Sequence, residues 1–302
     1  MIPETDSMRQ KRSDPRSTEQ LIQFALNEAD DDAAWEPVMV LHFRATSEVL
    51  ETAKRLCIGA APRERKLGAD ILGQLGVPDR AFPDECFHTL ARMVTDETDS
   101  EVLESIGIAF GHLHDIRAVE LLAPLRHHIS ADVRLGVVHG ISRQEDALAI
   151  SVLIELSRDE DDDVRDWATF GLGSMIETDS PEIREALVAR LADTNGDAKG
   201  EALVGLARRK DDRVLDPLLD ELTSENVGLL ALEAAEDLGD PRLVPALMAL
   251  KDGWRDEEDT HRKRLDYALL SSKRKTSLMK TLSLCQLISP LLLTLRVRNP
   301  LG

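Results

Sequence analysis

The residues of this chain best suited to chemistry are its histidines and cysteines, and their spacing argues against a metal site. The densest groups among the eight histidines are His112-Leu-His114 and the pair His127-His128. A bound metal needs three or four converging ligands, yet no histidine is followed by Glu and no His-x-x-x-His pair occurs. Cys57, Cys86 and Cys285 are far apart and have no Cys-x-x-Cys spacing. We therefore expect no metal, no cofactor and no catalytic residue.

Composition restricts the partners and the compartment. The formal net charge is −19 and aromatic residues make up only 3%, so the chain should repel phosphate backbones and we do not expect nucleic acid as a partner. The same charge favours a basic partner. An odd number of scattered cysteines fits the reducing cytoplasm, and the first twenty residues lack the apolar core of a secretory signal.

An internal repeat positions these side chains. The segment 163–173 repeats the pattern of 131–141, with an offset of 31 residues between Val133 and Val164. The same apolar closing position recurs along the chain. Its copies are Leu41, Leu72, Phe110, Ile141, Leu172, Leu206 and Ala235, separated by 31, 38, 31, 31, 34 and 29 residues. The 38-residue step contains a Pro-rich stretch, 76–83, which predicts a longer surface loop.

A second, shorter motif lies between these copies and completes a helix pair. It consists of an acidic residue followed by an apolar helix, as in 115–125, 181–188, 212–219 and 240–250. The acids should cap helix N-termini by accepting backbone N–H groups. We predict an all-α fold, a right-handed α-α superhelix of about eight helix pairs. In such a stack each pair buries its apolar face against its neighbours.

Three segments follow from this register. Residues 1–16 are expected to be a disordered N-terminus, 17–271 the repeat solenoid, and 272–302 a basic, Leu-rich tail. The tail has no acidic residue, and 281–295 carries no charge. Three interpretations remain open: a docked or disordered tail, a segment lying on an anionic membrane surface, or a gene-model artefact. Any membrane contact is therefore expected only through 272–302.

The repeat resembles the short bacterial HEAT repeats, in particular the phycobilisome-lyase HEAT-like type. The residues that carry this resemblance are Leu72-Gly-Gln-Leu-Gly76, Asp163-Val-Arg165 and 240–247. The resemblance covers roughly 18–271 and implies an armadillo-like helical fold. It also implies that the second helix of each pair lines the concave face. Repeats of this type occur in bilin lyases, in deoxyhypusine hydroxylase and in scaffolds without chemistry, and the His-Glu iron ligands of the hydroxylase are absent here.

A recurring basic residue near the start of the second helix has two interpretations. Its copies are Arg65, Arg134, Arg165 and Lys199, each near an acid. An Arg-rich concave face could hold the propionates of a bilin. An Asp–Arg ladder that joins adjacent repeats is the interpretation we favour.

The concave face should display the candidate binding residues. If every fourth residue of the second helices points into the core, the residues that follow each of these by two positions lean into the groove. This phase gives a candidate partner-binding surface whose members are Trp35, Glu104, Ile108, Leu135, His139, Asp166 and Phe170. Trp167, next to Ala168, is instead expected to be buried.

We therefore expect a non-catalytic, cytoplasmic scaffold or adaptor that binds another protein or a peptide in its groove. The alternatives are a bilin lyase-like or other small-molecule enzyme on the same repeat, and a regulatory module that acts on a basic partner.

Overall fold

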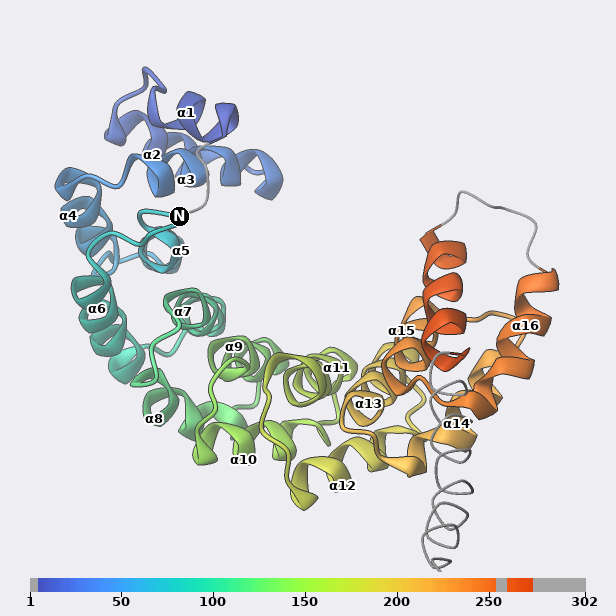
Figure 1. Cartoon of the computed structure of the whole chain (residues 1–302). Coiled ribbons are helices and arrows are strands. Elements are labelled where there is room, and N and C mark those ends of the chain that lie inside the picture. The colour runs from blue at the N-terminus through green and yellow to red at the C-terminus, as the bar shows by residue number, and fades with distance from the viewer. Residues whose placement is uncertain (1–4, 254–259, 274–302) are drawn as a thin grey trace, which may run out of the picture. The chain divides into compact units, whose positions relative to one another are not determined.

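The computed structural model describes residues 5–253 and 260–273, and within these ranges every regular element is a helix (Figure 1). The described chain divides into two compact units, Met1–Thr178 and Asp179–Gly302, called unit 1 and unit 2. In both units the helices pack in pairs joined by short turns. We call the first helix of each pair the A helix and the second the B helix. The predicted all-α class with stacked helix pairs is thus confirmed.

Unit 1 contains five such pairs in the described residues. Its A helices are α2 (Thr18–Asn27), α4 (Ser47–Leu56), α6 (Pro83–Asp96), α8 (Ala118–Leu122) with the 3-10 turn η1 (Ala123–His127), and α10 (Ala147–Leu156). Its B helices are α3 (Asp31–Arg44), α5 (Pro62–Gln74), α7 (Ser100–Leu113), α9 (Ala131–Ile141) and α11 (Asp162–Phe170), which continues into the π-helical turn η2 (Gly171–Met175).

Unit 2 contains three pairs in the described residues. They are α12 (Pro181–Arg190) with α13 (Gly196–Arg208), then η3 (Asp212–Val214) and α14 (Leu215–Leu222) with α15 (Leu229–Leu238). The third pair joins η4 (Pro241–Leu243) and α16 (Val244–Gly253) to a helix at 260–273. Of the basic tail at 272–302, residues 274–302 lie outside the described residues.

The N-terminal segment differs from the expectation of disorder. Residues Asp6–Arg12 form a short helix, α1, which Thr5 caps through its side chain. Arg12 donates a hydrogen bond to the carbonyl of Phe43 at 3.2 Å, so the segment is tied to α3. Arg16 also forms ion pairs with Asp14 and with Glu36 of α3. These polar contacts hold residues that the apolar pattern alone did not assign to the fold.

The repeat register corresponds to the core. All seven closing positions, from Leu41 to Ala235, have 0% exposed surface. Aspartates cap the helices as predicted: Asp30, Asp99 and Asp161 accept backbone N–H groups in the first turns of α3, α7 and α11. The 76–83 stretch forms the turns between α5 and α6, where Gly76 has a φ of 84° that favours glycine.

The recurring arginine forms the expected ladder. Arg134 of α9 donates two hydrogen bonds of 2.7 Å to Asp159, in the turn before α11, and both side chains are less than 10% exposed. Arg65 pairs in the same bidentate way with Glu97, in the turn before α7. A third nitrogen of each arginine binds the two carbonyls that lie six and five residues earlier in the chain. Arg165 repeats these two carbonyl contacts.

The buried ladder pair should therefore contribute far more stability than an exposed pair. Replacing Arg134 with Met leaves the Asp159 carboxylate buried without its cation, and we predict a loss of about 3 kcal/mol in the free energy of unfolding. Arg242→Met, which breaks the exposed pair with Asp240, should leave the free energy of unfolding almost unchanged. Urea unfolding measures both losses. Equal, small losses would show that the ladder does not stabilise the stack.

Candidate functional site

The inner side of unit 1 is built by its B helices, with the A helices α4, α6, α8 and α10 on the outer side (Figure 1). Glycines bring the backbones of α7 and α9 into direct contact. A Cβ added to Gly107 would lie 2.3 Å from the carbonyl oxygen of Gly136, and one added to Gly111 would lie 2.3 Å from that of His139. This contact places equivalent residues of neighbouring B helices side by side on the inner surface.

Six of the seven predicted residues lie together on this inner surface. Each is partly exposed, which separates it from the buried closing positions of the same helices. The six are Glu104 and Ile108 on α7, Leu135 and His139 on α9, and Asp166 and Phe170 on α11. The helical phase used to select them is therefore correct, while their role in binding stays a prediction. We call the surface formed by these six residues, Trp167 and Met175 the inner groove.

An aromatic row crosses the inner groove. The ring of Trp167 lies 4.7 Å from that of His139 and 5.7 Å from that of Phe170, both in edge-to-face geometry. Trp167 is 40% exposed, so the prediction that it is buried is wrong. The prediction considered only its position next to Ala168. Its spacing of three residues from Phe170 places both on the same side of the helix, which was the signal available in the sequence.

A hollow of about 300 Å³ lies beside this aromatic row. Its walls combine apolar side chains with basic ones, and the residues that line it are Ile108, Gly111, His112, His139, Ser142, Arg143, Trp167 and Met175. Met175 reaches the hollow because the chain continues through the π-helical turn η2. Turns of this kind are rare and often occur at functional sites.

Trp35, the seventh predicted residue, lies apart from the other six. It is 37% exposed on α3 and its ring contacts His42 edge-to-face at 5.8 Å. It lines a different hollow of about 590 Å³, together with Lys66, Asp70 and Glu101. The structure therefore does not place Trp35 in the inner groove.

Acidic side chains gather at the N-terminal end of the B helices. Burial raises the pKa of Glu104, and the nearby carboxylates of Asp132, Asp70 and Glu101 raise it further, whereas Lys66 lowers it. Burial likewise raises the pKa of Asp70, which forms an ion pair with Lys66 at 3.3 Å and accepts a hydrogen bond from Ser105. Glu104 itself has no hydrogen-bond or ion-pair partner within the described part of the chain.

Histidines follow the inner surface towards the C-terminal end of the B helices. Burial lowers the pKa of His139 and of His112, and Arg80 and Arg143 lower that of His112 further. His42 on α3 is buried, and this burial lowers its pKa to about 4. Its Nε2 lies 2.9 Å from the carbonyl oxygen of Asp70 and donates to it. On α7 and α9 the inner surface thus changes from carboxylates near the N-terminal end to histidines, with the neutral form favoured, near the C-terminal end.

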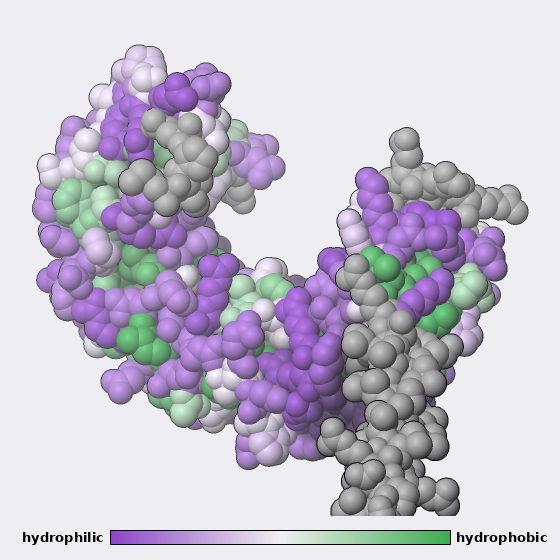
Figure 2. All heavy atoms as spheres, viewed as in Figure 1, coloured by the Kyte–Doolittle hydropathy of each residue, from purple (hydrophilic) through white to green (hydrophobic). Residues whose placement is uncertain are grey.

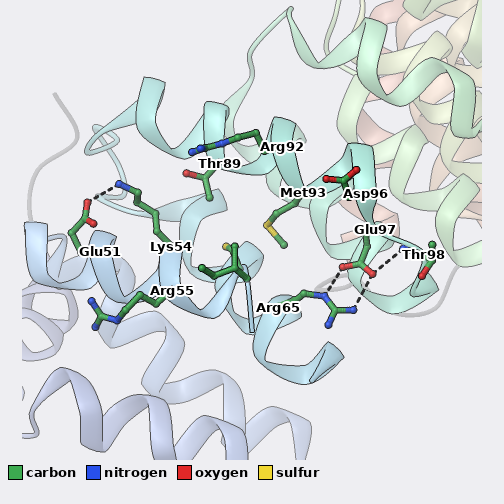
Figure 3. A pocket seen from close by; sticks show the side chains of 12 residues that line it. Glu51, Lys54, Arg55, Arg65, Thr89, Arg92, Met93, Asp96, Glu97 and Thr98 are labelled. Atoms are coloured by element: carbon green, nitrogen blue, oxygen red, sulfur yellow. Dashed lines mark hydrogen bonds and ion pairs between the residues drawn. The ribbon is translucent and has the colours of Figure 1, made fainter. Parts of the chain in front are cut away.

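A further hollow of about 530 Å³ lies between α4 and α6 on the outer side (Figure 3). Two ion pairs line it: Lys54 binds Glu51 at 2.7 Å, and Arg65 binds Glu97. Elsewhere, on the face seen in Figure 2, hydrophilic residues cover most of the surface. The inner groove differs from the outer hollow because it exposes a large aromatic side chain, Trp167, and because Glu104 of the same groove forms no ion pair within the described residues.

Within residues 5–253 and 260–273, no group of three His, Cys, Asp or Glu side chains could hold a metal ion. In the same ranges, no helix combines the length and the apolar character needed to cross a bilayer.

The fold and the groove define a protein of HEAT-like helical repeats. The chain is 32% identical to Protein YibA of Escherichia coli K12 over 225 residues, which span 72% of this chain and 80% of that relative. The crystal structure of Escherichia coli YibA superimposes with a TM-score of 0.70 at 26% identity, over 91% of this chain and 99% of that chain. This chain therefore belongs to the YibA family.

Comparisons with other proteins give no further information on function. No family model matches the chain. The complex of CpcE and CpcF of phycocyanin lyase from Nostoc sp. PCC7120 superimposes over 89% of this chain and 97% of that chain. Its TM-score is 0.46 and its identity 15%. A similarity this low has no bearing on function.

The glycine contact between α7 and α9 should not tolerate a side chain. Gly107→Ala would push a methyl group into the backbone of Gly136, and we predict a loss of about 2 kcal/mol or more in the free energy of unfolding. The control is Gly196→Ala, because a Cβ at Gly196 meets no atom within 4 Å. Denaturant titration compares the two variants. Equal stability of both would disprove the close contact.

Acidification should destabilise the fold through His42. Its pKa is about 4 in the folded chain and about 6.5 when unfolded, so the unfolded chain binds more protons between these values. The free energy of unfolding should therefore fall by up to about 3 kcal/mol as the pH decreases from 6.5 to 4. Urea unfolding across this range should give a shallower pH dependence for His42→Gln than for the wild type or the exposed control His88→Gln. An unchanged slope would contradict the assignment.

Proposed function

We propose that this chain is a non-catalytic binding protein whose inner groove holds an apolar segment of another protein. The observation that carries the proposal is the aromatic row of His139, Trp167 and Phe170 beside an open hollow of about 300 Å³. Large aromatic side chains that are fixed in place and partly exposed are typical anchors of protein interfaces. Exposed apolar side chains that lie together, rather than singly, mark an interaction site.

The arrangement of the arginines favours a scaffold over a bilin lyase-like enzyme. Arg65 and Arg134 would have to present their guanidinium groups to the propionates of a tetrapyrrole. Instead, both are held by Glu97 and Asp159 and by carbonyls of the adjacent turns. In the hollow itself the basic side chains are Arg143 and the two histidines.

The proposal extends to the repeat type and the compartment. We assign the repeats to the bacterial phycobilisome-lyase HEAT-like type, on the pattern of Leu72-Gly-Gln-Leu-Gly76 and Asp163-Val-Arg165. The two cysteines in the described residues, Cys57 and Cys86, are free and buried, as suits a protein of the reducing cytoplasm.

Capture from native cell extract by the tagged full-length chain tests the groove. A carboxylate on α9 and another on α11 should repel an apolar segment, so Leu135→Glu combined with Phe170→Glu should reduce recovery of the partner at least about tenfold. The control is Leu148→Glu on α10, where the side chain is already 42% exposed. Circular dichroism establishes that each variant remains helical.

A photo-crosslinking residue at Ile108 identifies what occupies the groove. The protein lost by the double variant should be the one that crosslinks at position 108 and is retained by the control. Recovery of the same partner by the folded double variant, or crosslinking only at an outer position such as Leu148, would refute the proposal.

A further inference from the structure

The N-terminal end of the inner groove has an excess of carboxylates over cations. Asp70, Glu101, Glu104 and Asp132 lie close enough for three of them to raise the pKa of Glu104 by repulsion. The cation that opposes them is Lys66, which is already paired with Asp70 at 3.3 Å. Glu104 is thus a half-buried carboxylate among like charges, an arrangement that costs free energy in the unbound protein.

Elsewhere in unit 1, three carboxylates that bridge neighbouring repeats receive an arginine. Glu97 is paired with Arg65, Asp159 with Arg134, and Glu155 with Arg126. Asp132, at the start of the neighbouring helix α9, occupies a position where the same stacking geometry could have placed a basic residue opposite Glu104. Glu104 instead has only a share of Lys66, which is already paired with Asp70.

The position of Glu104 relates it directly to the hollow. Glu104 and Ile108 are four residues apart on α7, so they lie on the same side of the helix, about 6 Å apart. Ile108 lines the hollow beside Trp167. Towards the C-terminal end of the B helices the hollow is lined by Arg143 and by His112, whose lowered pKa favours the neutral imidazole. A bound segment would therefore meet carboxylates on one flank, apolar surface in the middle and the Arg143 cation on the other.

From this arrangement we propose that the segment held in the inner groove is basic and apolar. It places a large apolar side chain in the hollow and a lysine or arginine against Glu104, about one helical turn away. This inference rests on the proposed function and specifies the chemistry of the partner. A cation at this point neutralises a carboxylate that the repeats leave unpaired. A phosphate-rich ligand would meet repulsion from the same residues.

Two synthetic peptides test the inference with the full-length chain. One is an amphipathic helix of about 16 residues with Leu and Phe on one face and Lys on the other; the second carries Gln in place of every Lys. The protein variants are Glu104→Gln and, as a control with the same change in charge, Glu120→Gln on the outer helix α8. Trp167→Ala reports on the apolar part of the groove. Calorimetric titration at low ionic strength gives each dissociation constant.

We expect Glu104→Gln to raise the dissociation constant of the Lys peptide about three- to fivefold, which is the effect of one partly exposed charge pair. The dissociation constant of the Gln peptide should stay unchanged. Glu120→Gln should change the dissociation constant of neither peptide. Equal effects of the two Glu→Gln variants would overturn the inference, because attraction would then come from net charge alone. If Trp167→Ala weakens both peptides while Glu104→Gln has no effect, the proposed function stands and the inference fails. If neither peptide binds the wild type, or Trp167→Ala alters neither, both fail.

Discussion

The close contact between α7 and α9 determines the form of the inner surface in unit 1. Glycine on both sides of this contact, at positions 107 and 136, lets two helix backbones touch without intervening side chains. The contact of α5 with α7 follows the same principle, because a Cβ on Gly73 would lie 2.8 Å from the Cα of Ala109. On the outer side, by contrast, α4 and α6 leave a hollow between them. Close packing of B helices and looser packing of A helices together produce a concave row of B helices.

Polar contacts in the turns hold this row in register. Arg65 and Arg134 each join a carboxylate of a neighbouring repeat to two carbonyls of their own preceding turn, as Arg134 does with Asp159, His128 and Ile129. Because every donor nitrogen has a fixed acceptor, the turns are rigid and the B helices keep their spacing. The inner groove can then present Trp167, His139 and Phe170 as a fixed set. Rigid anchors lower the entropy cost of binding.

Much of the fold could be predicted from the sequence because one periodic constraint governs it. The apolar closing position recurs seven times along the B helices, and each copy is fully buried. The same phase located Ile108, Leu135 and Phe170 at the edge of the core. The acidic helix starts, such as Asp99 and Asp161, were predictable because a helix N-terminus needs an acceptor.

The rest of the site depends on distances between repeats, which a single sequence does not contain. Met175 joins the hollow through a π-helical turn whose residues, Gly171-Leu-Gly, resemble a helix end. The exposure of Trp167 depends on the space left by α9. The unpaired state of Glu104 depends on which side chains face it from α5 and α9, a matter of helix contact rather than of spacing along the chain.

Amide hydrogen exchange on the chain with its captured partner tests the central claim, that the inner groove is the binding surface, most directly. Binding there should slow exchange in α7, α9 and α11, including residues 104–112 and 166–175, and leave α4, α6 and α10 unchanged. Slower exchange confined to the outer helices, with no change along the B helices, would contradict the account.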